Sequence, residues 1–298
     1  MSAAVELQGV SKSFKRGSRV LDRIELKIEK GEMVALIGAS GSGKSTLIRT
    51  IAGLISADRT DEALVSVLGT PIQRGGRIAG AANDLRSRIG VVFQQFNLVP
   101  RLTVLTNVCL GRLGQIGRLR GTLGRFSDDD RRRAMYALGR VGIADQALKR
   151  GSELSGGQQQ RAAIARSLVQ GADVLIADEP IASLDPNSAR RVMDILADLN
   201  RKDGITVLVS LHQVEYALLY CPRTIALRQG RIVYDGPSDA LTPSFLGELY
   251  GAESEKLILS PSVGRRDARE GAPTAGRSAL VPTVRRPMGP AIEIGTSA

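Results

Sequence analysis

The sequence is poor in the residues that build zinc sites, disulfide frameworks and aromatic surfaces. Its 298 residues include two cysteines, one histidine and no tryptophan, and aromatic residues make up only 3% of the chain. Cys109 and Cys221 stand far apart in no CxxC pattern, which excludes a zinc ribbon or a disulfide framework and fits a reducing compartment. The core must therefore consist mainly of Ile, Leu, Val and Ala.

Long apolar runs are missing as well. No stretch approaches the roughly 18 apolar residues of a membrane span, and the first residues, MSAAVELQGVSKSFKRG, lack the apolar centre of a signal peptide. We therefore expect a soluble chain on the cytoplasmic side of the membrane, which would attach to a membrane only through a partner.

Acidic residues are too few to balance the basic ones, and the formal net charge is +11. Such a balance favours nucleic acid, phosphate-rich ligands or an anionic membrane surface as partners. Arginines concentrate in residues 112–133 and 261–298. Neither segment interleaves arginine with aromatic residues, as a platform for single-stranded nucleic acid does. We expect most of these arginines to be solvated, and we expect no nucleic-acid partner.

Strand and helix patterns alternate along most of the chain, which predicts an α/β fold with a mainly parallel core sheet. An antiparallel β subdomain is expected at the N-terminus, and residues 96–167 are expected to form an inserted helical subdomain. Short apolar runs of the kind buried on both faces of a sheet are residues 32–38, 173–178 and 205–211. Alternating strands are expected at residues 5–14 and 19–31, and a hairpin turning at Gln229–Gly230 is expected near residues 224–237.

The character of the sequence changes near residue 255. Beyond it, Pro, Gly, Arg, Ser and Ala follow one another without periodicity. We expect residues 1–255 to form the domain and residues 256–298 to be a disordered tail.

A glycine-rich stretch, GASGSGKST, lies between a predicted strand and a predicted helix and matches the pattern GxxxxGK[ST] in full. Glycines let backbone N–H groups turn inward around phosphate oxygens, and the helix start directs its positive dipole end at the same anion. Lys44 is expected to bind the β- and γ-phosphates, and the Ser45 hydroxyl to ligate Mg²⁺. The predicted nucleotide contacts are Gly38, Ala39, Ser40, Gly41, Ser42, Gly43, Lys44, Ser45 and Thr46.

A second motif, VLIADEP, delivers two acidic residues at the end of an apolar strand, where α/β sheets place their ligands. Asp178 is expected to hold Mg²⁺, and Glu179 to polarise the attacking water as a general base. Alone, the motif would fit an exposed acidic turn equally well. Together with the glycine loop it predicts nucleotide hydrolysis.

A third motif, LSGGQQQR, precedes the acidic strand. It resembles the signature of ABC-type ATPases, so the resemblance implies the P-loop nucleotide-binding domain of that family. A serine and two glycines at a helix start make a second phosphate site. In that family this site closes on ATP held by another subunit, which assigns ATP contacts to Ser155, Gly156, Gly157 and Gln158.

The same resemblance assigns further roles. Phe14 matches the aromatic residue that stacks on adenine, although by itself a core position is the simpler explanation. Gln94 matches the glutamine that senses Mg²⁺ and the membrane partner and takes part in catalysis, with Gln95 as a rival. Asp185, in SLD, matches the loop at the dimer interface. His212, the only histidine, matches the residue that contacts the γ-phosphate.

The chain resembles one branch of the importers. FQQFNLVPRLTVLTNVCLGRL, DEPIASLDP and LHQVEYAL look like the ATP-binding subunits of phosphonate importers. That likeness implies ATP and Mg²⁺ as cofactors, a homodimer, two permease subunits, a periplasmic solute-binding protein and a place on the cytoplasmic side of the inner membrane. Three features depart from the pattern of this branch. They are Pro222, the lack of a glycine-led hairpin in residues 60–68, and the basic tail.

Other functions stay open at this point. An importer subunit for phosphate, phosphite or polar amino acids would share the same frame. A non-transport ABC ATPase, linked to nucleic acid or to phosphonate breakdown, would also carry the three motifs.

Overall fold

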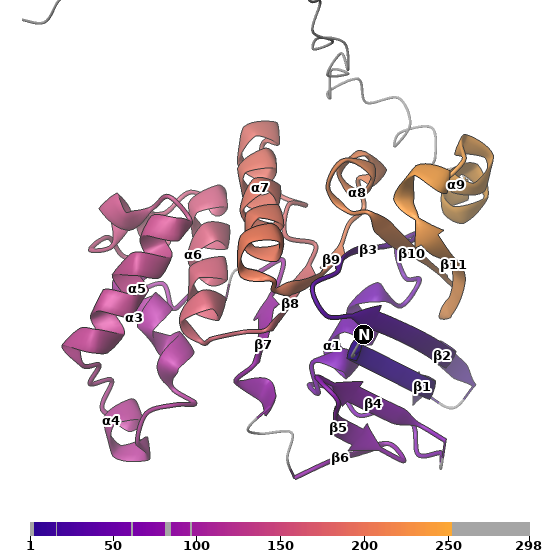
Figure 1. The fold of residues 1–298 in the computed structure, drawn as a ribbon, viewed down its shortest axis with the longest axis horizontal. Coiled ribbons are helices and arrows are strands. Elements are labelled where there is room, and N and C mark those ends of the chain that lie inside the picture. The colour runs from indigo at the N-terminus through magenta and orange to yellow at the C-terminus, as the bar shows by residue number, and fades with distance from the viewer. Residues whose placement is uncertain (1–2, 16, 61, 81–84, 96, 252–298) are drawn as a thin grey trace, which may run out of the picture. The chain divides into compact units, whose positions relative to one another are not determined.

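The computed structural model describes residues 3–15, 17–60, 62–80, 85–95 and 97–251 (Figure 1). The described residues all belong to one compact unit. The expected tail, residues 256–298, lies outside the described residues, so its boundary and its disorder remain predictions. In the part of the chain that is described, no helix is long and apolar enough to cross a membrane.

The larger sheet has the strand order β11-β10-β3-β9-β8-β7, and every neighbouring pair is parallel except β10 and β11. Its strands are β3 (Met33–Ile37), β7 (Ile89–Val92), β8 (Val174–Asp178), β9 (Thr206–Ser210), β10 (Arg223–Arg228) and β11 (Arg231–Pro237). The β10–β11 hairpin turns at Gln229 and Gly230, both with positive φ, which suits the twist of a tight hairpin. The parallel strands bring the ends of β3, β8 and β9 to one edge.

The smaller sheet is antiparallel, with the order β2-β1-β4-β5-β6. Its strands are β1 (Ala3–Lys15), β2 (Ser18–Glu29), β4 (Leu64–Val67), β5 (Thr70–Arg74) and β6 (Arg77–Ile78). Strands β4 and β5 form a hairpin that turns at Leu68 and Gly69. This hairpin was not predicted from the sequence, because residues 60–68 lack the glycine-led pattern.

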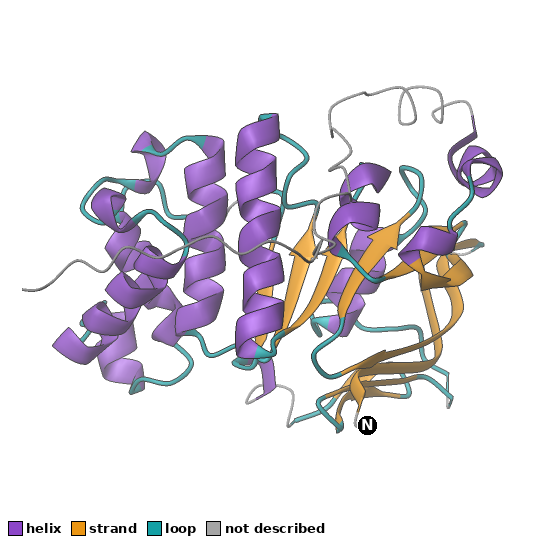
Figure 2. Cartoon of the chain, turned by 45° about the horizontal axis from the view of Figure 1, so that its top comes forward, coloured by secondary structure: helices purple, strands orange, loops and turns teal. Residues whose placement is uncertain are grey.

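Helices cover both faces of the larger sheet (Figure 2). They are α1 (Lys44–Ile51), α3 (Val104–Cys109), α4 (Arg118–Thr122), α5 (Asp128–Arg140), α6 (Gly156–Val169), α7 (Pro186–Asp203), α8 (Val214–Tyr220) and α9 (Pro243–Tyr250). Of these, α3 to α6 fall in or next to the stretch expected to be a helical insertion.

Two apolar cores lie on the two faces of the larger sheet, because side chains alternate along each strand. Met33, Ala35 and Ile37 of β3 join the core that also includes residues of α6 and α7. Val34 and Leu36 join the core that includes α1 and the antiparallel sheet. The uninterrupted apolar runs of β3, β8 and β9 therefore reflect burial on both sides.

The structure confirms the predicted fold class: a mainly parallel core sheet, an antiparallel β subdomain and a cluster of helices. Strands β4, β5 and β6 and helices α8 and α9 were not predicted. Pro71 and the polar residues around it break the apolar alternation in β5, and β6 has only two residues. The helices α8 and α9 have seven and eight residues, too few for a clear helical period.

Candidate active site

The glycine loop joins β3 to α1 and needs glycine at two positions for steric reasons. Gly38 has a φ of 148°, and a Cβ atom there would lie 2.2 Å from the carbonyl oxygen of Leu227. Gly43 has a φ of 109°, and its Cβ would lie 2.8 Å from the carbonyl oxygen of Val20. The loop is thus packed against β10 and β2 on its backbone side, which fixes the start of α1.

Lys44 begins α1, and its side chain is almost fully buried. Its Nζ atom donates hydrogen bonds to the carbonyl oxygens of Gly38, at 2.7 Å, and Ala39, at 3.3 Å. The ammonium group therefore lies within the curve of the loop. A positive charge and the amides of a helix start together make an anion-binding site.

The acidic strand end is held by a serine from the neighbouring strand. Ser45 Oγ donates to Asp178 Oδ1 at 3.2 Å, and Ser210 Oγ donates to the same oxygen at 2.9 Å. Ser210 Oγ also accepts the backbone N–H of Glu179, at 2.9 Å. Glu179 has a φ of 51°, which is uncommon for a residue other than glycine. The serine thus fixes both carboxylate-bearing residues at the end of β8.

Glu179 and His212 form a close pair across the ends of β8 and β9. His212 Nε2 lies 2.5 Å from Glu179 Oε1, although the two residues are 33 positions apart. This hydrogen bond lowers the pKa of the Glu179 carboxyl below its ordinary value of 4.5, Lys44 adds to the effect, and partial burial opposes it. At neutral pH the carboxylate is ionised and can accept a proton.

One cavity joins the glycine loop to Glu179 and His212, whereas Asp178 and Ser210 do not line it. It has a volume of about 220 Å³ and lies over the glycine loop. Glu179 and His212 line it together with Val20 and residues 40–46 of the loop. Gly38 and Ala39 are not among its lining residues, but their carbonyl oxygens accept hydrogen bonds from Lys44 Nζ. The cavity therefore combines anion-binding groups with an ionised carboxylate and an imidazole.

The signature segment lies at the start of α6, away from this cavity. Ser155 is exposed and caps the helix: its backbone N–H donates to Gln158 Oε1 at 3.0 Å, and its Oγ accepts the N–H of Gln158 at 3.4 Å. A Cβ atom on Gly157 would lie 2.7 Å from Ser188 Oγ of α7. In a single copy, Ser155, Gly156, Gly157 and Gln158 are absent from the lining of the glycine-loop cavity.

Asp185 caps α7 and is exposed. Its Oδ1 accepts the backbone N–H groups of Asn187, at 3.1 Å, and Ser188, at 3.0 Å. Hydrogen bonding to Ser188 lowers the pKa of Asp185 below its ordinary value of 3.8. Because Ser188 lies directly beside Gly157, the starts of α6 and α7 are neighbours in the fold.

Two expected residues do not reach the cavity. Phe14, at the end of β1, is 60% exposed, and Lys12 Nζ lies 5.3 Å from its ring centroid. Gln94 follows β7 and is exposed, as is its rival Gln95. Neither Phe14 nor Gln94 lines the cavity, and the structure gives no reason to prefer Gln94 to Gln95.

Sequence reasoning missed three residues that shape the site: Val20, Ser210 and Tyr250. Val20 lines the cavity, and the Tyr250 hydroxyl of α9 accepts the N–H of Gly38 at 3.3 Å. Ser210 offered a signal, since it is a polar residue directly after the apolar run Val207–Val209. Tyr250 gave none, because its role depends on where α9 packs.

The oxygen atoms beside the glycine loop suit Mg²⁺. Ser45 Oγ and Asp178 Oδ1 lie 3.2 Å apart, and one or two such ligands with substrate phosphates are the usual protein contribution to this ion. Among the described residues, no group of three His, Cys, Asp or Glu side chains could hold a metal. The donor set therefore fits a magnesium ion shared with phosphate better than a cage made by protein alone.

The ABC transporter family matches residues 21–182, a range that includes the glycine loop, the signature segment and both acidic residues. A solved ATP-binding cassette, a dimer in a post-hydrolysis state with ADP and phosphate bound, is 34% identical. It superimposes with a TM-score of 0.67, covering 80% of this chain and all of that one. The chain belongs to the ABC transporter family and is an ABC-type ATPase.

Within this family the chain belongs with the phosphonates import ATP-binding proteins. One such protein, from Pseudomonas aeruginosa strain UCBPP-PA14, is 58% identical over 268 residues, or 90% of this chain and 96% of the relative. Another, from Stutzerimonas stutzeri, is 58% identical over 259 residues, or 87% of this chain and 94% of the relative.

Proposed function

We propose that this chain hydrolyses ATP to drive a membrane importer whose transported compounds are phosphonates. The observation that carries the hydrolytic part is the 2.5 Å contact between Glu179 and His212 inside the cavity of the glycine loop. The phosphonate part is supported by the names of the relatives and not by any contact in this site, because a transported compound does not touch the ATP cavity.

The proposal assigns a role to each residue of the cavity and to Ser210 beside it. The glycine loop, residues 38–46, binds the phosphates, with Lys44 as its positive charge. Glu179 accepts a proton from the attacking water, and its low pKa keeps it ionised for this task. His212 orients the Glu179 carboxylate and contacts the terminal phosphate. Ser210 positions both acidic residues.

Mg²⁺ is proposed as the metal cofactor. Ser45 and Asp178 would hold it, with Gln94 as a further ligand once the loop after β7 moves toward the cavity. When bound, the ion neutralises charge on the phosphates during transfer. The 3.2 Å contact between Ser45 and Asp178 supports their assignment, whereas Gln94 is exposed and does not contact them.

A homodimer is proposed as the working unit. Ser155, Gly156, Gly157 and Gln158 of one copy would contact the ATP held by the glycine loop of the other, with Asp185 at the interface and Phe14 against adenine. The exposure of Ser155, Asp185 and Phe14 in a single copy supports this arrangement. ATP can drive closure only by binding the closed state more tightly than the open one.

The remaining partners follow from the proposed transport. Two permease subunits would bind near Gln94, and a periplasmic solute-binding protein would deliver the phosphonate. The chain would then lie on the cytoplasmic side of the inner membrane. We also propose that residues 1–255 are the ATPase domain, with a helical subdomain at residues 96–167, and that residues 256–298 form a tail outside it.

Uptake of labelled methylphosphonate tests the proposal in cells that lack this chain. Wild-type protein should restore uptake, whereas Glu179→Gln should bind ATP and dimerise but lower hydrolysis by about 1,000-fold and fail to restore uptake. Labelled phosphate and glutamate are the parallel substrates. If uptake is restored for phosphate or glutamate and not for methylphosphonate, the proposed substrate class is wrong. Normal ATP hydrolysis in Glu179→Gln would contradict the proposed role of the Glu179 carboxylate.

A further inference from the structure

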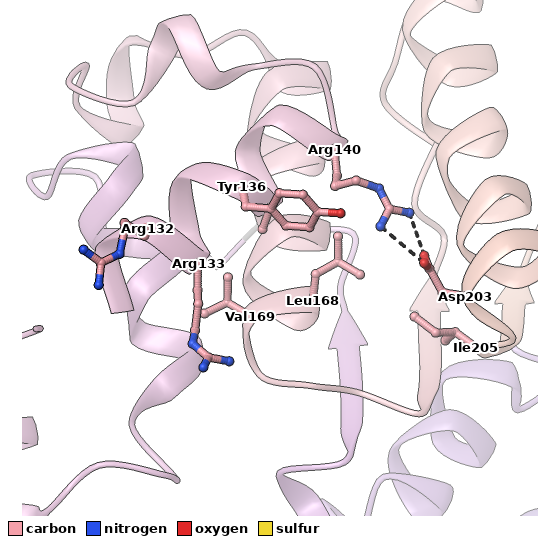
Figure 3. Close-up of a pocket in the computed structure, with 9 residues that line it drawn as sticks. Arg132, Arg133, Tyr136, Arg140, Leu168, Val169, Asp203 and Ile205 are labelled. Atoms are coloured by element: carbon pink, nitrogen blue, oxygen red, sulfur yellow. Dashed lines mark hydrogen bonds and ion pairs between the residues drawn. The ribbon is translucent and has the colours of Figure 1, made fainter. Parts of the chain in front are cut away.

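A second cavity lies at the opposite edge of the parallel sheet from the glycine loop. It has a volume of about 410 Å³ and is bounded by α5, the end of α6, the end of α7 and the start of β9 (Figure 3). Ile205, which lines it, precedes the first residue of β9, whereas His212 follows the last. The volume falls within the range of about 300 to 1,000 Å³ that is usual for small-molecule sites.

The floor of this cavity is apolar. Leu168, Val169 and Ile205 line it, together with Ala137 of α5. Ala137 and Val169 are buried, with 3% and 7% of their surface exposed. A ligand there would cover the carbon surface of two helices and a strand, so its body should itself be apolar.

The rim of the cavity is cationic and comes mainly from one face of α5. Arg132, Tyr136 and Arg140 are spaced four residues apart, which places them on the same side of the helix. Arg133 joins them. Figure 3 shows the exposed ring of Tyr136 between Arg132 and Arg133 on one side and Arg140 on the other. A planar ring between guanidinium groups is suited to contact an apolar or aromatic body.

Carboxylates in contact with these arginines do not balance their charge. Arg140 forms two hydrogen bonds with Asp203, at 2.6 and 3.3 Å, across the cavity from α5 to the end of α7. Arg133 donates to Asp129 at 2.7 Å, and Arg132 reaches the other oxygen of Asp129 only at 3.9 Å. Three guanidinium groups thus share two carboxylates, which leaves a positive charge over an apolar floor.

We propose that this cavity binds a small organic anion with a phosphonate- or phosphate-type head and an apolar body. Guanidinium groups are planar forks that match such oxygens in two-point contacts. Arg132 and Arg133 would hold the head, and Tyr136, Leu168 and Ile205 would contact the body. The organic phosphonates of the proposed function belong to this class, but the argument rests on the cavity and not on that function.

Calorimetric titration with phenylphosphonate tests the proposal on the full chain. The glycine loop is first saturated with a non-hydrolysable ATP analogue, so that binding there cannot be mistaken for binding at the second cavity. Phenylphosphonate should bind, and inorganic phosphate, which lacks a carbon body, should bind at least about tenfold more weakly. Failure of phenylphosphonate to bind the ATP-analogue complex would overturn the proposal, whether or not the chain hydrolyses ATP.

Paired variants locate the binding. The double change Arg132→Gln with Arg133→Gln should lower the affinity for phenylphosphonate by at least about tenfold, since charge-assisted bonds to the head are lost. The double change Arg125→Gln with Arg131→Gln removes the same two charges from nearby positions. Neither residue lines the cavity, so this variant should change the affinity by less than about twofold. Equal losses of affinity in the two variants would mean that overall charge, and not this cavity, determines binding, and would overturn the proposed site. Unchanged binding of the ATP analogue confirms that the variants are folded.

The source of the anion is separated by a vesicle experiment. Vesicles of phosphatidylglycerol and phosphatidylcholine offer the same phosphate chemistry on a membrane surface. If the ligand is a free small molecule, phenylphosphonate should bind in solution. The double change at Arg132 and Arg133 should then leave the binding of vesicles unchanged. Vesicle binding that depends on Arg132 and Arg133, without binding of phenylphosphonate, would assign the surface to lipid headgroups and overturn the proposal.

Discussion

Two helices of this chain begin at glycine-rich segments, yet their surroundings differ. The start of α1 is enclosed: Gly38 and Gly43 pack against neighbouring strands, and Glu179 and His212 share its cavity. The start of α6 is open, and Ser155 and Gln158 satisfy each other's backbone amides in a capping box. A similar local sequence thus lies in an enclosed cavity at α1 and at an open helix start at α6, which in the proposed dimer would be completed by a second copy.

A third helix start shows what a capping box does by itself. At the start of α5, Ser127 and Asp130 form the same reciprocal bonds as Ser155 and Gln158, without glycines and away from the cavity of the glycine loop. That box is structural. A capping box therefore does not by itself mark a binding site. In the proposed dimer, the neighbours of each glycine-rich helix start would decide whether one copy of the chain is sufficient. Four substitutions test this comparison, from the largest expected effect on ATP turnover to the smallest.

Gly38→Ala should remove the enclosed site. The new Cβ atom would meet the Leu227 carbonyl oxygen at 2.2 Å, in a backbone conformation that alanine rarely adopts. We expect the affinity for ATP, measured by fluorescence titration, to fall by at least about 100-fold, and hydrolysis to fall with it. Gly139→Ala is the control, because α5 has open space there and the change should stabilise the helix by roughly 0.5 to 1 kcal/mol. Near-normal ATP affinity in Gly38→Ala would show that the loop is not the binding element.

His212→Ala should separate binding from hydrolysis within the enclosed site. The pair with Glu179 is lost, while the glycine loop and Lys44 stay in place. We expect a loss of about 100-fold in the rate of hydrolysis, with ATP affinity changed by less than about threefold. Stopped-flow phosphate release measures the rate of hydrolysis, and equilibrium titration measures the affinity for ATP. If hydrolysis survives, His212 has only a structural role.

Ser155→Ala should affect the open site alone. Loss of the cap lowers the free energy of unfolding by about 1 kcal/mol. Hydrolysis should fall by about tenfold in the dimer, while ATP binding to a single copy is unchanged. Ser127→Ala removes the equivalent cap from α5 and also the bond from Ser127 Oγ to the Asp130 carboxylate, so it should cost at least as much stability. Its hydrolysis should nevertheless be normal at temperatures well below unfolding. Equal losses of hydrolysis in the two variants would assign the effect of Ser155 to folding.

Asp130→Asn should leave ATP turnover unchanged and alter only stability. The Asp130 carboxylate accepts bonds from Ser127, at 2.7 Å, and from Arg112, at 3.2 Å, and the Ser127 bond is the main cause of its lowered pKa. We expect the free energy of unfolding to fall by about 1 to 3 kcal/mol in urea titrations at neutral pH.

The pH dependence of that difference has a definite sign. The folded pKa of Asp130 lies below its ordinary value of 3.8, so the carboxylate stabilises the fold above pH 3.8 and loses this effect as the pH falls through the folded pKa. The stability gap between wild type and Asp130→Asn should be constant between about pH 5 and 7 and shrink below about pH 3.8. A gap that widens on acidification would contradict the assignment.

Parts of the fold were predictable because their signals are local. The apolar runs of β3, β8 and β9 are bounded by polar or glycine residues, and the glycine loop has fixed spacing. The strands β5 and β6 have no such pattern, and α8 and α9 are too short for one, so their form depends on the surfaces against which they pack. In the site, Ser210 was missed for a related reason: a serine at a strand end gains a role only when a neighbouring strand brings Asp178 and Glu179 beside it.

By itself, the sequence predicted which residues would carry phosphate chemistry: the loop of residues 38–46, the acidic pair at the end of β8, the signature before α6 and the single histidine. Their residue types and spacing are sufficient for that. Only the tertiary structure decided that His212 meets Glu179 at 2.5 Å and that Ser155 does not line the cavity. The reason is that these distances follow from the order β3-β9-β8 in the sheet, which is fixed by packing two apolar cores on its faces and is written in no local stretch of the chain.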